Sequence, residues 1–387
     1  MNYSVTFLAS VIPNDTLEPR SIEIMDAFLG EDTFQFVDKG SPLLFIASGG
    51  SERPASKVAA DFKNITLLCH RESNSYAATM EIAAFLRSQG KRVSVIDVFQ
   101  PNSLEEFKSI QKVYHALDQL STEKAALVGE VSDWLIISDV ENQKIKDLLG
   151  IDLQRISWND LEHFKSKDSS KDFMQFFPEK DAHLLEDTAK VYSILEEVVN
   201  EKKLSAISVE CFSMVMRDQV TACLPLSVFN NKNIVAACEG DICSMIGKML
   251  IRAICGSTPW QANIAEIKEE TILLAHCTAP LHLLESFDIT THFETGCGTA
   301  IRGSFKKGKV GVFRINSTLD KYMLIEGDIT DTPQHDFACR TQIELTTTPQ
   351  QTQKLKDKAL GNHHLVFPIE NAPLLEKMME ILEIVRV

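Results

Sequence analysis

Two short apolar runs, each leading to an acidic residue and then to a helix-like segment, constrain the fold of this chain most. Residues 206–209 lead to Glu210, and residues 233–236 lead to Asp241 a few positions later. Alternating strands and helices favour a parallel sheet, because parallel strands need long crossover connections. Since ligands bind at the carboxyl edge of such sheets, we expect Glu210 and Asp241 to face one shared site.

The same alternation of strand and helix occupies the N-terminal part. Three strand-like runs flank a helical segment there: residues 42–47, 64–69 and 92–97. This spacing predicts a parallel, flavodoxin-like sheet. Glu52 and Asn74 follow the first two runs, so we expect both at one sheet edge. There they either contact a substrate or cap helices.

The remaining chain continues this pattern and then changes after Pro259. A second strand–helix unit begins near Lys124, whereas short strands alternate with glycine-bearing turns from Thr290 onward. The latter is typical of a small antiparallel barrel or sandwich. We therefore predict an α/β fold with two Rossmann-like (flavodoxin-like) parallel-sheet domains followed by a β-rich, barrel-like C-terminal domain. The predicted boundaries are 1–122, 123–238 and 239–387, and the last domain completes the site.

Composition excludes several classes of protein. The net charge is −15 and no stretch is rich in lysine or arginine, so the basic footprint of a nucleic-acid-binding protein is missing. No apolar run approaches the roughly 20 residues of a membrane-spanning helix. The N-terminus lacks the pattern of a secretory signal, and the nine cysteines form no CxxC pair. We therefore expect a cytoplasmic protein with buried, reduced thiols.

A third candidate segment lies near the C-terminus, where Gly361-Asn362 precedes two adjacent histidines. Two carboxylates and an imidazole suit a hard-to-borderline divalent metal. We expect Glu210, Asp241 and His363 to be its ligands, with His364 left open as the alternative imidazole. Taken singly, each acid is as well explained as a helix cap, and the histidine as a turn residue.

Several short motifs follow one another along the chain, at residues 209–212, 237–241, 274–277, 291–296 and 361–363, with two more at 49–52 and 132–135. Their order resembles that of the L-fucose isomerase and L-arabinose isomerase superfamily, and most of all that of its shorter, fucose-isomerase-like proteins, which the motifs at 49–52 and 132–135 also match. The likeness covers most of the chain and rests on the order of the motifs rather than on one of them.

This resemblance implies aldose–ketose isomerisation through an enediol, with Mn²⁺ or another divalent cation, in a homo-oligomer. It implies that Glu210 and Asp241 are metal-binding carboxylates, which we also expect to be the acid–base pair, and that His363 is the metal-binding histidine. His276 corresponds best to an additional histidine near the metal in the arabinose branch, or is an ordinary core histidine. We expect the substrate-binding residues to be His276, Glu52, Asn74 and His292, the last with strand-turn structure as its alternative.

The sugar itself stays open between several hypotheses. A deoxy-sugar or a pentose is the leading expectation. An acid-bearing sugar such as a sulfo-sugar is the alternative and needs a cation in the pocket, for which the candidates are Arg217, Arg302 and Arg314. A non-catalytic sugar-binding protein on the same scaffold is the rival from another class. A nucleotide-dependent oxidoreductase is disfavoured, because no GxGxxG motif follows a strand.

Overall fold

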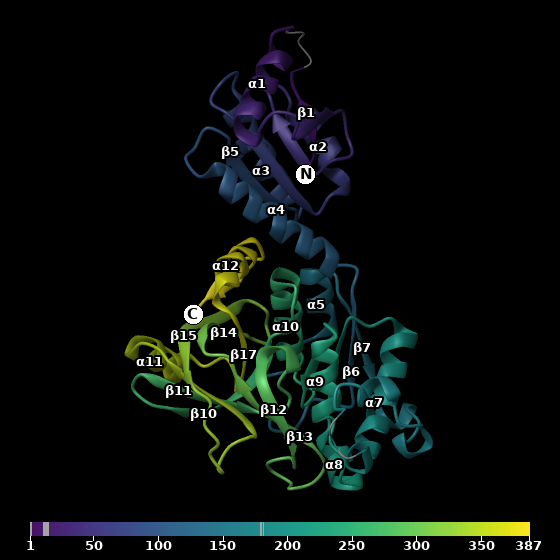
Figure 1. Cartoon of the computed structure of the whole chain (residues 1–387). Helices are drawn as coiled ribbons and strands as arrows, with labels where there is room; N and C mark the ends of the chain where they lie inside the picture. The colour runs from purple at the N-terminus through teal and green to yellow at the C-terminus, as the bar shows by residue number, and fades with distance from the viewer. Residues whose placement is uncertain (1, 11–14, 179, 181) are drawn as a thin grey trace. The chain divides into compact units, whose positions relative to one another are not determined.

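The structure, a computed structural model, describes residues 2–10, 15–178, 180 and 182–387. The chain divides by compactness into two units, residues 1–118 and 119–387. Each unit contains a parallel sheet, and the second also contains a strand-rich antiparallel sheet (Figure 1). The predicted fold class is therefore confirmed. The three-domain boundaries stay predictions, since the division keeps residues 119–387 together.

The first unit is a five-stranded, all-parallel sheet in the order β2-β1-β3-β4-β5, the flavodoxin-like order. Strands β3 and β4 are buried along their whole length, which explains their unbroken apolar sequences. The strands are β1 Tyr3–Leu8, β2 Phe34–Val37, β3 Leu43–Ile46, β4 Asn64–Cys69 and β5 Arg92–Asp97. The helices are α1 Leu17–Leu29, α2 Glu52–Val58, α3 Ser75–Ser88 and α4 Ser103–Leu120, which ends just inside the second unit.

The second unit begins with a four-stranded parallel sheet in the order β7-β6-β8-β9. Its two site-bearing strands, β8 and β9, are neighbours, and Val209 pairs with Cys238 at their carboxyl ends. The strands are β6 Lys124–Val128, β7 Asp152–Ile156, β8 Ala206–Val209 and β9 Val235–Cys238. The helices are α5 Asn142–Leu149, α6 Lys171–Met174, α7 Ala182–Lys202, α8 Phe212–Asp218, α9 Cys223–Asn231 and α10 Ile242–Cys255.

An antiparallel barrel completes the second unit. Its strands follow one another in the order β14-β17-β10-β11-β16-β15, and β14 also pairs with β15, which closes the ring; β18 adds a short parallel strand to β15. A separate hairpin joins β12 and β13. The strands are β10 Trp260–Ile267, β11 Thr271–His276, β12 Leu284–Thr290, β13 Ala300–Phe305, β14 Gly308–Ile315, β15 Lys321–Asp331, β16 Thr341–Thr346, β17 His363–Pro368 and β18 Val385–Arg386. The helices are α11 Pro349–Lys358 and α12 Ala372–Ile381.

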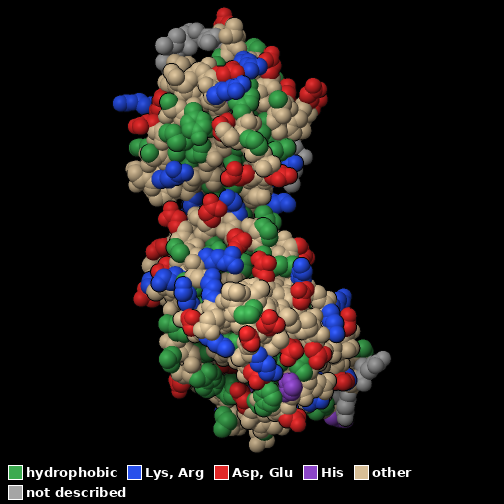
Figure 2. Space-filling view, turned by 90° about the vertical axis from the view of Figure 1, so that its left-hand side faces the viewer, with side chains coloured by type: hydrophobic (Ala, Val, Ile, Leu, Met, Phe, Trp, Pro, Cys, Tyr) green, Lys and Arg blue, Asp and Glu red, His purple; other side chains and the backbone are tan. Residues whose placement is uncertain are grey.

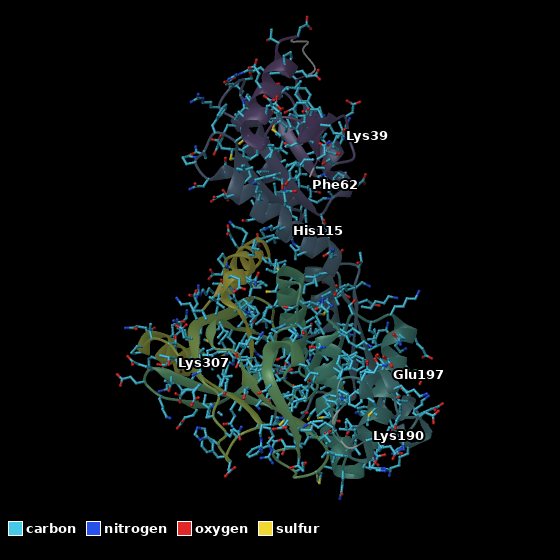
Figure 3. The ribbon with its side chains drawn as sticks, in the orientation of Figure 1. Lys39, Phe62, His115, Lys190, Glu197 and Lys307 are labelled. Carbon is cyan, nitrogen blue, oxygen red and sulfur yellow. The ribbon has the colours of Figure 1, made fainter. Side chains whose placement is uncertain are left out.

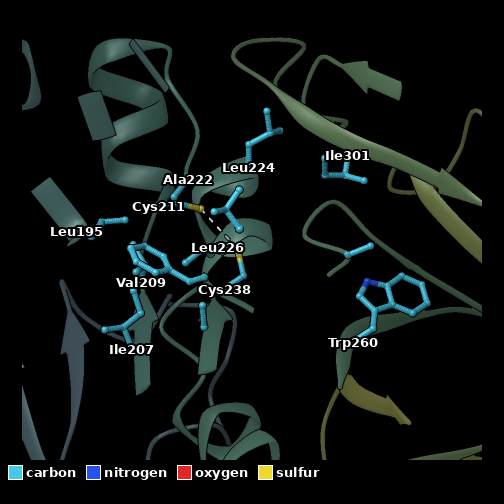
Figure 4. Packing of buried hydrophobic residues seen from close by; sticks show 14 of the residues in the cluster. Leu195, Ile207, Val209, Cys211, Ala222, Leu224, Leu226, Cys238, Trp260 and Ile301 are labelled. Atoms are coloured by element: carbon cyan, nitrogen blue, oxygen red, sulfur yellow. Dashed lines mark hydrogen bonds between the residues drawn. The ribbon is translucent and has the colours of Figure 1, made fainter. Parts of the chain in front are cut away.

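Helix α10 connects the parallel sheet to the barrel. It contacts β9 on one side and β14 and β17 on the other, as Figure 1 shows. Glycine at 247 allows this close approach, because a Cβ there would lie 2.6 Å from Leu365 Cδ1. One hydrophobic cluster continues from Val209 to Trp260 in the barrel (Figure 4). The shared core fixes the carboxyl ends of β8 and β9 against the first residues of β17.

The surface carries charges of both signs. Figure 2 shows lysine and arginine side chains beside aspartate and glutamate, with apolar patches between them. Lys190 and Glu197 on α7 lie at the outer rim of the second unit (Figure 3), where they pair with Glu186 and Lys167. Exposed pairs of this kind stabilise a fold by only about 0–1 kcal/mol. Within the described residues, no helix has the length and apolarity needed to cross a membrane.

Candidate active site

The turn between β9 and α10 carries two acids, Glu239 and Asp241, separated by Gly240. Glu239 and Gly240 both have left-handed backbones, with φ of 63° and 69°. A Cβ at position 240 would lie 2.3 Å from the carbonyl oxygen of Glu130, so this left-handed turn requires glycine. Asp241 then caps α10, because its Oδ1 accepts a 2.7 Å hydrogen bond from the Ser244 N–H.

Asp241 is fully buried and its second oxygen is also engaged. Oδ2 lies 2.9 Å from Arg314 Nη1 and 2.9 Å from His363 Nδ1. Arg314 is buried too, and it also donates to the hydroxyls of Ser244 and Ser138 over 3.1 and 2.8 Å. The structure therefore brings Asp241 and His363 together, as the sequence predicts, but it surrounds Asp241 with donors on both oxygens.

Glu239 lies on the other side of His363 and faces two imidazoles. Its Oε1 is 3.5 Å from His363 Nε2 and 3.6 Å from His276 Nε2. The opposite nitrogen of each ring has a partner: His363 Nδ1 contacts Asp241, and His276 Nδ1 lies 2.9 Å from the Thr278 hydroxyl. Both Nε2 atoms are buried and lack a hydrogen-bond partner among the described residues. One carboxylate oxygen and two free imidazole nitrogens thus converge.

This convergence fits a divalent metal. A metal-bound imidazole uses one nitrogen as ligand and donates its other N–H to a carboxylate, a hydroxyl or a backbone oxygen, which fixes the ring. His363 and His276 both have that arrangement. Cys238 also brings its thiol into the group, since the ligand atoms of Cys238, Glu239 and His276 lie within 4.8 Å of one another. Carboxylate oxygens suit Mn²⁺ and Mg²⁺, imidazoles suit Zn²⁺ and other transition metals, and a thiolate would favour softer metals.

Charge coupling supports the ionised state of these carboxylates. Burial opposes the negative charge of Glu239, but His363 and His276 outweigh it and hold the pKa of Glu239 well below its usual value. Burial likewise opposes the charge of Asp241, yet Arg314 and His363 keep its pKa low. Burial disfavours the charged form of His363, but Glu239 and Asp241 raise its pKa to about 9. Burial lowers the pKa of His276.

Glu210 lies at the end of β8 and is only half-buried. Its Oε1 accepts a 2.9 Å hydrogen bond from the Ser213 N–H, and its Oε2 accepts from the Ser213 hydroxyl. It therefore accepts from the first turn of α8 from a position one residue before the N-cap, Cys211, which is close to the capping alternative that the sequence leaves open. Because Val209 pairs with Cys238, the next residues along, Glu210 and Glu239, occupy equivalent positions on neighbouring strands. Glu239, rather than Asp241, is thus the counterpart of Glu210 in the register.

His363 and His364 point to opposite faces of β17, because successive strand residues alternate. His363 faces the acids, whereas His364 Nδ1 lies 2.9 Å from the Asn362 carbonyl oxygen. The preference for His363 over His364 therefore agrees with the geometry. His292 lies in the loop after β12, with its Nδ1 3.1 Å from the Thr295 hydroxyl and its Nε2 3.7 Å from Glu294.

Glu52 and Asn74 belong to the first unit. Glu52 opens α2 after β3, and Asn74 precedes α3 after β4 with a left-handed φ of 58°. Both therefore lie at the carboxyl edge of the five-stranded sheet, where the sequence predicts them. Asn74 makes no side-chain cap to α3. Their substrate-binding role stays a prediction, as do the ligand and acid–base roles of Glu210, Asp241 and His363.

Three residues at this site, Cys238, Glu239 and Trp134, were not predicted from the sequence as site residues. Glu239 and Cys238 immediately precede the acid that the strand–helix pattern selects, and the signal that identifies them is their position directly at the strand end. Trp134 donates a 2.6 Å hydrogen bond from its indole Nε1 to Glu239 Oε2. It stands in the motif at 132–135, but no pattern in the sequence shows where that loop lies.

Comparisons with known proteins find similar sequences among sugar isomerases. No protein-family model matches the chain. A sulfoquinovose isomerase of Priestia aryabhattai is 22% identical over 263 residues, which cover 63% of this chain and 58% of that protein. A sulfoquinovose isomerase of Alkalicoccus urumqiensis is 22% identical over 300 residues, covering 72% of this chain and 66% of that protein. The chain therefore spans less than two thirds of the length of these relatives, to which its sequence is similar.

Proposed function

We propose that this chain is an aldose–ketose isomerase that holds one divalent cation and acts on a sulfo-sugar by an enediol route. The observation that carries the proposal is the convergence of Glu239 Oε1 with the unpartnered Nε2 atoms of His276 and His363. Relatives named sulfoquinovose isomerase support the same reaction class. They favour the sulfo-sugar alternative over the deoxy-sugar or pentose expected first.

The residues that would hold the cation are Glu239, His276 and His363, with Glu210 as a further oxygen donor from the neighbouring strand. When bound, a divalent cation supplies Lewis-acid polarisation of adjacent sugar oxygens. Mn²⁺ is the proposed ion, because it suits carboxylate ligands and is the ion that the family resemblance implies. Asp241 then orients His363 through Nδ1 and stays behind it, since Arg314, Ser244 and His363 already occupy both of its oxygens.

Proton transfer requires a carboxylate that reaches the sugar. The C–H beside a carbonyl is a weak acid, so a positioned base must remove its proton and return it to the adjacent carbon. Glu210 is half-buried and lies at the sheet edge where ligands bind. Its hydrogen bonds from Ser213 hold the carboxylate in place. We therefore assign the acid–base role to Glu210, with Glu239 rather than Asp241 as the opposing carboxylate.

A sulfo-sugar also needs a cation for its sulfonate. Arg314 and Arg217 already have carboxylate partners. Arg314 forms a buried ion pair with Asp241, and Arg217 pairs with Asp218 over 2.8 Å. Arg340 is a better candidate. It donates to the Thr291 carbonyl oxygen over 2.9 Å, and its guanidinium lies 5.7 Å from the centre of the Phe293 ring. Arg340 thus stands next to the loop that contains His292, one of the residues expected to bind the substrate.

The test is deuterium exchange from solvent into C2 of sulfoquinovose, measured by proton NMR with Mn²⁺ and with EDTA. Fucose and arabinose serve as comparison sugars. We expect metal-dependent exchange with sulfoquinovose and at least tenfold less with the others. Sugar binding with no exchange, in protein shown to hold Mn²⁺, would contradict the proposal and favour the non-catalytic sugar-binding alternative. Exchange with fucose alone would restore the deoxy-sugar hypothesis.

A further inference from the structure

Trp134 is tied by its polar end to the proposed cation site. It lies in the loop between β6 and α5, and its indole N–H occupies Glu239 Oε2 over 2.6 Å. The loop is fixed there because the Ser132 N–H donates to the Glu239 carbonyl oxygen over 3.1 Å. With Oε2 occupied, Oε1 is the oxygen that faces His276 and His363. Trp134 thus sets the rotation of the Glu239 carboxylate.

The body of the same side chain is open to solvent. Trp134 is 53% exposed, although tryptophan is highly buried on average. Its ring meets Phe212 edge to face, with centroids 4.7 Å apart and planes at 79°. Phe212 meets His292 in the same way at 5.5 Å and 76°. We call Trp134, Phe212 and His292 the aromatic wall.

We propose that the aromatic wall is the surface against which the carbon chain of the sugar rests, and that Trp134 is also a positioning residue for Glu239. This inference rests on the proposed function and adds two specific roles to it. A sugar presents C–H groups on its faces and hydroxyls at its edge. An indole can cover the C–H groups with its ring while its N–H serves a polar partner, the amphipathic use typical of tryptophan in binding sites.

The positioning role predicts an effect on Mn²⁺ affinity, and the sugar-contact role predicts an effect on KM. Two substitutions of Trp134 can distinguish these effects. Trp134→Phe keeps a ring and removes the N–H. Trp134→Leu removes both. Loss of a hydrogen-bond partner of a metal ligand costs about 10–100-fold in metal affinity, so we expect both variants to bind Mn²⁺ at least tenfold more weakly. Loss of the ring surface in Trp134→Leu should in addition raise KM for the sugar roughly tenfold, about 1.4 kcal/mol, while Trp134→Phe changes KM less than threefold at saturating Mn²⁺.

Trp260→Phe is the matched control. Its indole N–H has no hydrogen-bond partner among the residues that the structure describes, and its buried ring packs against Phe305 of β13. This variant should keep the Mn²⁺ affinity and KM of the parent. Mn²⁺ affinity is measured by electron paramagnetic resonance of the free ion. Tryptophan fluorescence during titration with sulfoquinovose gives a second readout, and its change should vanish in Trp134→Phe and persist in Trp260→Phe.

Unchanged Mn²⁺ affinity in Trp134→Phe would overturn the positioning role. Unchanged KM in Trp134→Leu, with a fluorescence change that survives Trp134→Phe, would overturn the aromatic wall as the sugar surface. If the parent protein shows no exchange with any sugar, the proposed function fails, but the Mn²⁺ titration and the fluorescence titration still decide the two roles. Circular dichroism confirms folding, and Trp134→Phe decides alone if the leucine variant does not fold.

Discussion

The carboxyl ends of β8 and β9 lie side by side, but the helices that follow them are capped in different ways. Each strand is followed at once by a glutamate, Glu210 or Glu239, and then by a helix that needs an N-terminal cap. After β8 the glutamate accepts a hydrogen bond from the Ser213 N–H in the first turn of α8. After β9 the connection is one residue longer, residues 239–241 against residues 210–211, and Asp241 caps α10. The additional residue lets Asp241 take the capping role while the Glu239 carboxylate faces the histidines.

The two ends also differ in burial. Asp241 is fully buried with Arg314 and His363, whereas Glu210 is half-buried and contacts a serine. A buried, fully bonded carboxylate is suited to hold a histidine in place, and a half-exposed one is suited to exchange protons with a substrate. The comparison therefore assigns different tasks to acids that the strand–helix pattern presents as equals.

The largest expected effect is the loss of Mn²⁺ binding on substitution of Glu239, which distinguishes this residue from Glu210. Glu239→Gln should weaken Mn²⁺ binding more than 100-fold and abolish exchange at C2, because it removes the charged oxygen between His276 and His363; loss of a mere hydrogen-bond partner of a ligand costs about 10–100-fold. Glu210→Gln should abolish exchange while weakening Mn²⁺ binding less. Isothermal titration with Mn²⁺ and the NMR assay measure both. Equal Mn²⁺ affinity in Glu239→Gln and the parent would remove Glu239 from the ligand set.

The architecture around this comparison could largely be predicted from the sequence. The strand that ends at Val209, the apolar run at 233–236 that overlaps β9, the parallel sheets and the barrel-like C-terminal region all follow from apolar periodicity and turn residues. The preference for His363 over His364 rests on the family resemblance instead. What periodicity could not give is which acid of the segment 239–241 faces the site. An aspartate directly before a helix is the strongest cap signal in that segment. That signal is the structural alternative to a ligand role for Asp241, which rests on the match of residues 237–241 to the resembled superfamily and stays a prediction.

Contacts between distant segments were also beyond the sequence. Trp134 reaches Glu239 across 105 positions of the chain, and Arg314 reaches Asp241 across 73. Both contacts depend on how a loop and a barrel strand pack on the end of β9, which no local pattern encodes. The matched motifs contain Trp134, Glu239 and Asp241 but not Arg314, and only the fold shows which of these side chains touch.

The next effect tests the buried cation behind β9. Arg314→Met should destabilise the protein by about 3–5 kcal/mol, because it leaves the Asp241 charge buried without its partner. Arg155→Met is the control: it breaks a partly exposed pair with Asp139, which is worth about 0–1 kcal/mol. Urea unfolding measures both. A similar loss of unfolding free energy in the two variants would show that the buried Asp241–Arg314 pair contributes no more to stability than the partly exposed pair.

A smaller effect tests the left-handed turn. Gly240→Ala should cost at least about 2 kcal/mol more than Gly256→Ala, although both glycines have a similar positive φ. A Cβ at 240 meets the Glu130 carbonyl oxygen, whereas a Cβ at 256 meets no atom within 4 Å of those described. Gly240→Ala should also weaken Mn²⁺ binding, because the turn aims Glu239. Equal unfolding free energies would show that the loop at 130 moves aside without cost.

The last prediction is small at neutral pH and grows with pH, and it concerns Lys248 on α10, a buried lysine that has no counterpart among the described residues of α8. Its Nζ donates to Ala236 O of β9 over 2.8 Å and to Asn230 Oδ1 over 3.1 Å. Burial lowers the pKa of Lys248 to about 7, against about 10.4 in an unfolded chain. Between these values the unfolded chain binds more protons, so this lysine makes stability rise with pH by up to about 1.4 kcal/mol per unit.

Lys248→Met should remove that rise. The free energy of unfolding of the parent minus that of the variant should be flat below pH 7 and climb between pH 7 and 10, as measured by urea unfolding at each pH. The methionine is tolerated because Ala236 O keeps its 2.8 Å hydrogen bond from Asn230 Nδ2. Lys232→Met is the control, since Lys232 is partly exposed and paired with Asp172, and its curve should run parallel to the parent up to pH 10. If the free energies of unfolding of both variants ran parallel to that of the parent, Lys248 would stay charged in the folded protein. The interior beside β9 would then accept a charged lysine as well as the buried Arg314.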